Sequence, residues 1–219
     1  MLETRSQSDH VAVLPKADCY SAGERGAMAW WQDLRAELLG PLLAWAAGCG
    51  VRPDHVTLAS LFAGLAFCPL WLWPGQPVWA RIAALLALLL HAVLDGLDGP
   101  LARYLGVASR RGSFTDTVVD QIVVTASALA AMAAPSPALH VWIGGSYIFL
   151  YALVVAFAMV RNALEVPYSW LIRPRFLVYG WFAIDWLLIP GSLSFVVGVC
   201  AVLLAAKMAS GFVAIRRLL

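Results

Sequence analysis

The feature that most constrains this chain is a series of long apolar stretches that begins after Pro53. A run of about 20 predominantly apolar residues is long enough to cross a bilayer as a helix. Six such stretches follow one another, separated by breaks that contain proline or glycine. They cover residues 55–74, 79–102, 113–134, 138–160, 174–190 and 192–214. The pattern predicts an all-α polytopic membrane protein with six transmembrane helices.

Composition supports this prediction and excludes several other classes of protein. Of the 219 residues, 62% are hydrophobic and 13% are charged, whereas soluble domains are about half apolar and a quarter charged. The net charge of +2 gives no reason to expect a nucleic-acid partner. The four cysteines are widely spaced and form no CxxC pair, so neither a disulfide framework nor a zinc site is indicated.

The N-terminal part of the chain has a different character. Residues 1–54 are predicted to form a cytoplasmic segment, and residues 55–219 the membrane domain. Between about residues 25 and 47, apolar residues recur at helical spacing and include Trp30 and Trp31. This pattern predicts an amphipathic helix on the membrane surface, with the tryptophans at headgroup depth. A cap on the helix bundle is an alternative that is compatible with it.

Basic residues predict the orientation of the spans. All but two of the fifteen lysines and arginines fall on one predicted side; Arg81 falls on the other side and Lys207 within the last span. Because basic residues concentrate on the cytoplasmic side of membrane proteins, both termini are expected in the cytoplasm. An even number of spans satisfies this arrangement.

Acidic residues are the exception to the apolar pattern. From residue 55 onward there are six: Asp95, Asp98, Asp116, Asp120, Glu165 and Asp185. Four of them lie between residues 95 and 120, in or at the cytoplasmic end of predicted spans. A charge in hydrocarbon costs several kcal/mol, so such residues are rare and usually functional. The group of four is therefore the candidate functional site. For Asp185 and Lys207, an ion pair within the membrane is one option.

The spacing of the four aspartates predicts where they point. Asp95 and Asp98 are three residues apart and share a helix face, as do Asp116 and Asp120, which are four apart. A short link joins the two helices, so we expect antiparallel neighbours with facing acidic surfaces. Carboxylate oxygens suit hard cations such as Mg²⁺ or Mn²⁺. Four of them can hold two ions about 3.5–4 Å apart and clamp a phosphoryl group.

Buried carboxylates of this kind also line cation pathways and proton relays. On these observations alone, a carboxylate-based cation or proton transporter is as well supported as a catalyst. A structural ion-pair network is less favoured, because Arg103 is the one basic residue close to the four acids in sequence.

The residues between the acids resemble a known family. The segment runs Asp95-Gly-Leu-Asp98-Gly99-Pro-Leu-Ala102-Arg103, then eight residues to Gly112, with Asp116 and Asp120 following at intervals of four. It is similar to the signature D-x2-D-G-x2-A-R-x8-G-x3-D-x3-D of the CDP-alcohol phosphotransferases, with all eight fixed positions present. Residues 52–57 also resemble the family's Pro-Asn-x-x-Thr entry to the first span, with Asp54 in place of Asn.

The resemblance implies a reaction and a set of site residues. An alcohol oxygen would attack the β-phosphorus of a CDP-linked donor, usually CDP-diacylglycerol, and CMP would leave. Asp95, Asp98 and Asp116 would be ligands of Mg²⁺ or Mn²⁺, and Asp120 would be a ligand, the general base, or both. The donor nucleotide and its phosphates would be bound by Asp98, Gly99, Ala102, Arg103, Gly112 and Thr57. The alternative roles are helix packing for the glycines and Ala102, interface anchoring for Arg103 and helix capping for Thr57.

The acceptor alcohol is less sharply indicated. Four cytoplasmic arginines, Arg110, Arg111, Arg173 and Arg175, are candidates to bind an acceptor phosphate, although the positive-inside pattern explains them equally well. Glycerol 3-phosphate is the first choice; inositol phosphate, serine, choline and an acylglycerol are alternatives. Thr115 and Gln121 depart from a common form of the family and leave the acceptor class open. The resemblance also implies a homodimer in a bilayer, most simply the bacterial inner membrane, with the active site facing the cytoplasm.

Overall fold

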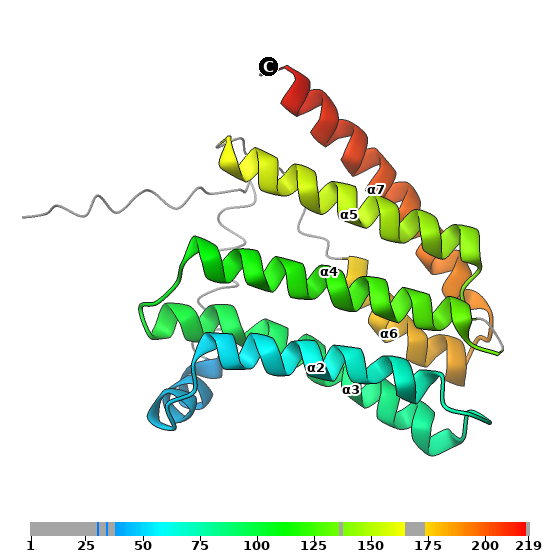
Figure 1. Ribbon diagram of the computed structural model, residues 1–219, viewed down its shortest axis with the longest axis horizontal. Coiled ribbons are helices and arrows are strands. Elements are labelled where there is room, and N and C mark those ends of the chain that lie inside the picture. The colour runs from blue at the N-terminus through cyan, green and yellow to red at the C-terminus, as the bar shows by residue number, and fades with distance from the viewer. Residues whose placement is uncertain (1–29, 31–33, 35–37, 136–137, 165–173, 218–219) are drawn as a thin grey trace, which may run out of the picture.

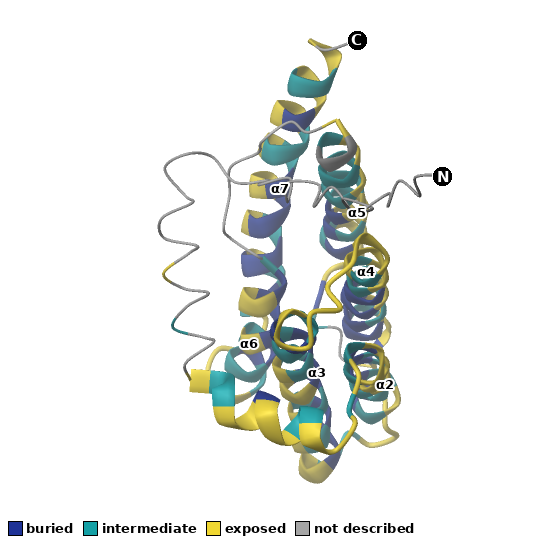
Figure 2. Cartoon of the chain, turned by 90° about the vertical axis from the view of Figure 1, so that its left-hand side faces the viewer, coloured by how far each residue is buried: buried dark blue, intermediate teal, exposed yellow. Residues whose placement is uncertain are grey.

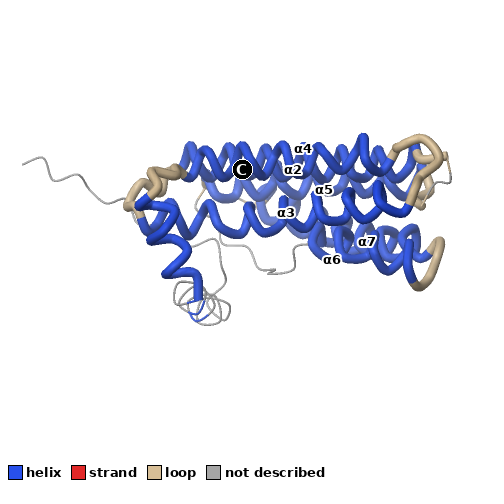
Figure 3. The backbone as a smooth tube through the Cα atoms, turned by 90° about the horizontal axis from the view of Figure 1, so that it is seen from below, coloured by secondary structure: helices blue, strands red, loops and turns tan. Residues whose placement is uncertain are grey.

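A computed structural model describes residues 30, 34, 38–135, 138–164 and 174–217. Six long or medium helices dominate these residues, and no strand is present among them (Figures 1 and 3). Their bounds are α2 Pro53–Trp71, α3 Val78–Tyr104, α4 Arg110–Ala133, α5 Val141–Ala163, α6 Pro174–Leu187 and α7 Ser192–Arg216. The prediction of an all-helical polytopic membrane protein is confirmed.

The described residues account for five of the six predicted spans as full-length helices. Within the described residues, five helices (α2, α3, α4, α5 and α7) are long and apolar enough to cross a membrane. The fifth predicted span, 174–190, corresponds to α6, which has 14 residues. At 1.5 Å per residue α6 covers about 21 Å, which is short of the roughly 30 Å hydrocarbon core. A sixth full span is therefore not found in this part of the chain.

The predicted surface helix lies largely outside the described residues. Its described portion is an apolar helix over Leu38–Gly48. In it, Leu38 and Trp45 are well exposed, whereas Leu43 is buried. The interfacial location of this helix stays a prediction, as does the boundary between residues 54 and 55.

The helices pack in a connected bundle. Helix α2 packs against α3 and α4, and α5 packs against α4 and α7. The short α6 contacts both α3 and α7 (Figures 1 and 2). Small residues allow the closest approach: a Cβ on Gly64 of α2 would lie 2.5 Å from a methyl carbon of Val123 on α4. The core includes Phe67, Leu88, Val123 and Phe182, which are almost completely buried.

Helix α6 is joined to α7 by a polar contact in the core. The Asp185 Oδ1 atom accepts a hydrogen bond of 2.7 Å from the backbone N–H of Leu193, in the first turn of α7. Asp185 also attracts the buried Arg81 guanidinium, which lies 3.9 Å from the Trp71 ring centre. Lys207 is fourteen residues beyond Leu193, about 21 Å further along α7, so Asp185 caps a helix and does not pair with Lys207.

Removal of this cap is expected to destabilise the bundle. In Asp185→Ala the Leu193 N–H loses its acceptor, which costs about 1–2 kcal/mol for a helix N-terminus. Thermal unfolding in detergent, followed by circular dichroism, measures the loss. Asp185→Asn keeps an acceptor oxygen and is expected to lose less than half as much. Equal unfolding temperatures for Asp185→Ala and the wild type would contradict the capping role.

Candidate active site

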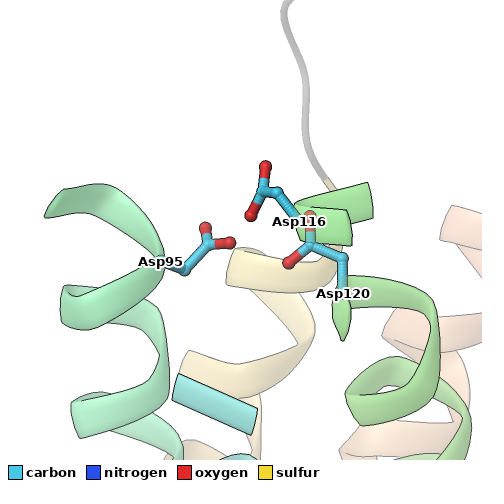
Figure 4. A group of neighbouring side chains, drawn as sticks. All are labelled: Asp95, Asp116 and Asp120. Atoms are coloured by element: carbon cyan, nitrogen blue, oxygen red, sulfur yellow. The ribbon is translucent and has the colours of Figure 1, made fainter. Parts of the chain in front are cut away.

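Three of the four predicted aspartates meet at one place. One carboxylate oxygen each from Asp95, Asp116 and Asp120 lies within 4.8 Å of the other two. Asp95 comes from α3 and the other two from α4, and the three carboxylate groups point toward one another (Figure 4). Asp95 and Asp120 are buried, and Asp116 is half-buried.

The link between α3 and α4 explains why the two acidic faces meet. Gly106 has a φ of 68°, which glycine adopts without the strain of a Cβ atom, and the chain reverses there. The Ser109 side chain then caps α4 by accepting a hydrogen bond of 3.1 Å from the Gly112 N–H. A short turn therefore joins the acid-bearing end of α3 to the acid-bearing start of α4, while α2 packs against both helices and α3 and α4 do not pack along each other.

Asp98, the fourth aspartate, is next to this cluster but is held differently. Its Oδ2 atom accepts a hydrogen bond of 2.7 Å from the Thr57 hydroxyl on α2, and its Oδ1 accepts one of 2.6 Å from the Gly99 N–H. Its carboxyl group is close enough to Asp116 to interact with it. Thr57 therefore orients an acidic residue. Helix capping, the alternative role considered from the sequence, does not describe this contact.

We expect loss of the Thr57 hydroxyl to be costly. In Thr57→Val the shape is kept but the buried Asp98 carboxylate loses a donor, and hydrogen bonds to charged groups contribute about 1.5–3 kcal/mol. The midpoint of thermal unfolding in detergent should fall accordingly. Thr57→Ser restores the hydroxyl and should recover most of the difference; no recovery would show that packing, and not this hydrogen bond, was lost.

His91 makes a second polar link between α2 and α3, one helical turn before Asp95. Its fully buried ring places Nδ1 2.8 Å from the Ser60 hydroxyl oxygen. The edge of the ring also meets Tyr179 of α6, with the ring centres 5.7 Å apart. Two hydrogen-bonded pairs, Thr57 with Asp98 and Ser60 with His91, thus fix the rotation of α3 against α2.

Arg175 opens α6, as its place at the start of the fifth predicted span indicated, and its side chain reaches the aspartates. It is the second residue of α6, is 2% exposed, and contacts aspartates of both α3 and α4. Its Nη2 donates to Asp95 Oδ2 at 2.7 Å, and its Nη1 forms an ion pair with Asp120 Oδ2. Binding of an acceptor phosphate by Arg175 stays a prediction; the start of α6 turns into the bundle and brings the guanidinium to the two aspartates.

The other predicted arginines are placed as follows. Arg103, Arg110 and Arg111 are exposed, and Arg173 lies outside the described residues. The Arg103 guanidinium is 3.5 Å from the position that a Cβ on Gly99 would take, so it covers that face of α3.

The small residues of the motif have distinct surroundings. Gly99 and Ala102 are half-buried on α3. A Cβ on Gly112 would meet only the Ser109 hydroxyl within 4 Å, so close approach of another helix, which the sequence suggested there, is not what this glycine provides. The Gly112 N–H instead donates the hydrogen bond to Ser109 that caps the start of α4.

The donor set fits a hard divalent cation. Within the described part of the chain, four carboxylates are opposed by one bound guanidinium, so the site carries excess negative charge. Asp120 Oδ1 is buried and finds no hydrogen-bond partner among these residues. A buried oxygen of this kind is costly unless a ligand satisfies it. Oxygen-only donors of this charge suit Mg²⁺ or Mn²⁺.

Comparison with known proteins decides between the two classes that the aspartates left open. A sequence profile described as CDP-alcohol phosphatidyltransferase matches residues 50–211, about three quarters of the chain, and includes the whole aspartate cluster. The chain belongs to the CDP-alcohol phosphatidyltransferase family. The resemblance seen in the sequence is confirmed, and the transporter alternative loses its support.

Individual relatives match this chain over shorter segments. An archaetidylinositol phosphate synthase of Aeropyrum pernix is 40% identical over 70 residues, which are 32% of this chain and 34% of that protein. A phosphatidylinositol phosphate synthase of Streptomyces avermitilis is 37% identical over 89 residues, which are 39% of this chain and 33% of that protein. The matches thus span about a third of each relative.

The family description names phosphatidyl transfer that involves a CDP-linked alcohol. The buried aspartate cluster is the feature of the fold that can serve this chemistry.

Proposed function

We propose that this phosphatidyltransferase moves the phosphatidyl group of CDP-diacylglycerol, or of a related CDP-linked lipid, to an inositol phosphate and releases CMP. The convergence of Asp95, Asp116 and Asp120 from two helices is the observation that carries the catalytic part. The names of the Aeropyrum and Streptomyces relatives support inositol phosphate as the acceptor. This choice replaces glycerol 3-phosphate, which the sequence patterns alone had favoured.

The proposed cofactors are two divalent ions, Mg²⁺ or Mn²⁺. Asp95, Asp116 and Asp120 would hold them together with Asp98, which Thr57 orients from α2. Bound there, the ions would neutralise the donor pyrophosphate and stabilise the charge that develops on the leaving phosphate.

The protein's own groups supply the remaining steps. Asp120 takes the proton of the acceptor hydroxyl while that oxygen forms a bond to the β-phosphorus. The bond from this phosphorus to the bridging oxygen breaks, the electron pair stays on CMP, and the proton passes to solvent. Arg103 would hold a donor phosphate by charge-assisted hydrogen bonds. Gly99 and Ala102 keep the adjacent face of α3 low enough for the nucleotide.

We place the site at the cytoplasmic face of a bacterial inner membrane, with both termini on the same side. The arginines near the site support this orientation: Arg103, Arg110 and Arg111 lie around the end of α3 and the start of α4, where the positive-inside pattern expects them. A homodimer is proposed from the family resemblance.

Product identification tests the proposal directly. Purified protein in detergent or vesicles is incubated with Mg²⁺, CDP-diacylglycerol and one acceptor at a time: inositol phosphate, glycerol 3-phosphate, inositol, serine or choline. We expect CMP release and a new phosphorylated lipid with inositol phosphate, at least about tenfold faster than with the others. CMP release with a different acceptor would keep the reaction class and reject the acceptor, whereas no CMP with any donor and acceptor would reject the catalytic proposal.

A further inference from the structure

Both terminal nitrogens of Arg175 are bound by carboxylates that belong to different helices. Nη2 donates to Asp95 on α3, and Nη1 pairs with Asp120 on α4. The remaining nitrogen of this side chain, Nε, has no hydrogen-bond partner among the residues that the structure describes. Arginines that grip a phosphate do so with paired N–H groups of the guanidinium fork. The fork of Arg175 is used inside the protein, which argues against the acceptor-binding role expected from its sequence position.

We propose that Arg175 is a positioning residue that orients Asp95 and Asp120 toward the divalent ions, an inference that rests on the proposed function. The guanidinium binds one oxygen of each carboxylate and leaves Asp120 Oδ1 buried, with no hydrogen-bond partner in the part of the chain that the structure describes. A group that binds one oxygen of a metal ligand fixes the direction of the other oxygen. Arg175 therefore selects which Asp120 oxygen faces the site.

The surroundings of Arg175 hold it in place. Its side chain is 3% exposed, and its Cζ atom lies 4.7 Å from the ring centre of Phe176. The other end of α6 is tied to α7 through the bond from Leu193 to Asp185. Helix α6 has 14 residues and is thus held near each end by a charged side chain. Arg175 at its start contacts the aspartates, and Asp185 near its end accepts a hydrogen bond from α7.

Metal binding without substrates measures this role separately from turnover. The Kd for Mn²⁺ is determined by electron paramagnetic resonance on the full chain in detergent, for wild type, Arg175→Gln and Arg175→Lys. We expect Arg175→Gln to raise the Kd at least about tenfold, as loss of a group that orients a ligand commonly does. Arg175→Lys keeps the charge without the fork and should raise it by a smaller factor. Arg216→Gln, on the exposed last turn of α7, is the matched control and should stay within about twofold of wild type.

Several results would overturn the proposal. An unchanged Kd in Arg175→Gln would show that the contacts do not orient ligands, and a lower Kd would show that the guanidinium competes with the ion. If the wild type does not bind Mn²⁺, the aspartates are not metal ligands and Arg175 cannot orient them toward an ion. If Arg175→Gln does not fold, the Kd of Arg175→Lys for Mn²⁺ takes its place. An unchanged or lowered Kd in Arg175→Lys would then overturn the proposal.

Steady-state kinetics separate positioning from acceptor binding. Positioning predicts that Arg175→Lys lowers kcat and raises the Mn²⁺ requirement while the KM for inositol phosphate stays within about twofold. A KM raised tenfold with unchanged kcat and Mn²⁺ affinity would assign Arg175 to the acceptor phosphate instead. If the wild type binds Mn²⁺ but transfers to no acceptor, the proposed function fails, while the Mn²⁺ Kd values still test Arg175.

Discussion

An Asp120→Asn variant is expected to release CMP about 10³–10⁴-fold more slowly than the wild type. Asparagine keeps an oxygen that can accept from Arg175, so the local shape survives. It cannot take the acceptor proton, and proton transfer by a positioned base contributes about 10²–10⁴-fold. It also lacks the negative charge of a metal ligand. Single-turnover CMP release with CDP-diacylglycerol and inositol phosphate measures the effect.

The matched control for Asp120→Asn is the same substitution at Asp185. Asp185 is also buried, but its carboxylate binds the Leu193 N–H near the start of α7, away from the aspartate cluster. Asp185→Asn is expected to keep CMP release within about twofold of wild type. A fall of less than tenfold in well-folded Asp120→Asn would reject Asp120 as the base.

Removal of divalent ions is expected to abolish transfer, with CMP release falling at least about 100-fold after dialysis against EDTA. The reason is electrostatic: without ions, the carboxylates around Asp95, Asp116 and Asp120 repel a pyrophosphate that must lie against them. Addition of Mg²⁺ or Mn²⁺ should restore the rate.

Circular dichroism before and after dialysis is the control for this treatment, because the helical content should not change. Full activity in EDTA with no ion bound to the protein would contradict metal dependence. Loss of helical structure would instead assign the ions a role in folding.

The sequence predicted the helical class and the aspartates well because both depend on local patterns. Apolar runs of bilayer length define helices wherever they occur, and three- or four-residue spacing places two aspartates on one face. Asp95, Asp116 and Asp120 accordingly converge. The expectation that α3 and α4 pack as direct neighbours is wrong, because α2 packs against both of them; the carboxylates of Asp95, Asp116 and Asp120 nevertheless converge beyond the short link.

Contacts between distant segments were not predictable in the same way. Arg175 is 80 residues from Asp95, so no local spacing links the two side chains. The one sequence signal was its place at the opening of the fifth predicted span, from which it could face the cavity. Asp185 was equally ambiguous, because its partner is a backbone N–H that carries no sequence signal.

The length of α6 shows a second limit of pattern reading. Residues 174–190 have the composition of a span, but the described helix ends at Leu187 and is followed by Pro190 and Gly191. Gly191 has a φ of 86° and turns the chain directly into α7. Hydropathy counts apolar residues and does not register where a turn shortens the helix.

The central claim is that aspartates from α3 and α4 bind divalent ions jointly. Anomalous diffraction from crystals grown with Mn²⁺ and CDP-diacylglycerol tests it most directly. We predict manganese peaks about 2.0–2.2 Å from carboxylate oxygens of both helices, with Asp120 Oδ1 among the ligands, beside the donor pyrophosphate. Manganese bound elsewhere, or a donor held with no ion contacting Asp95, Asp116 or Asp120, would contradict the account.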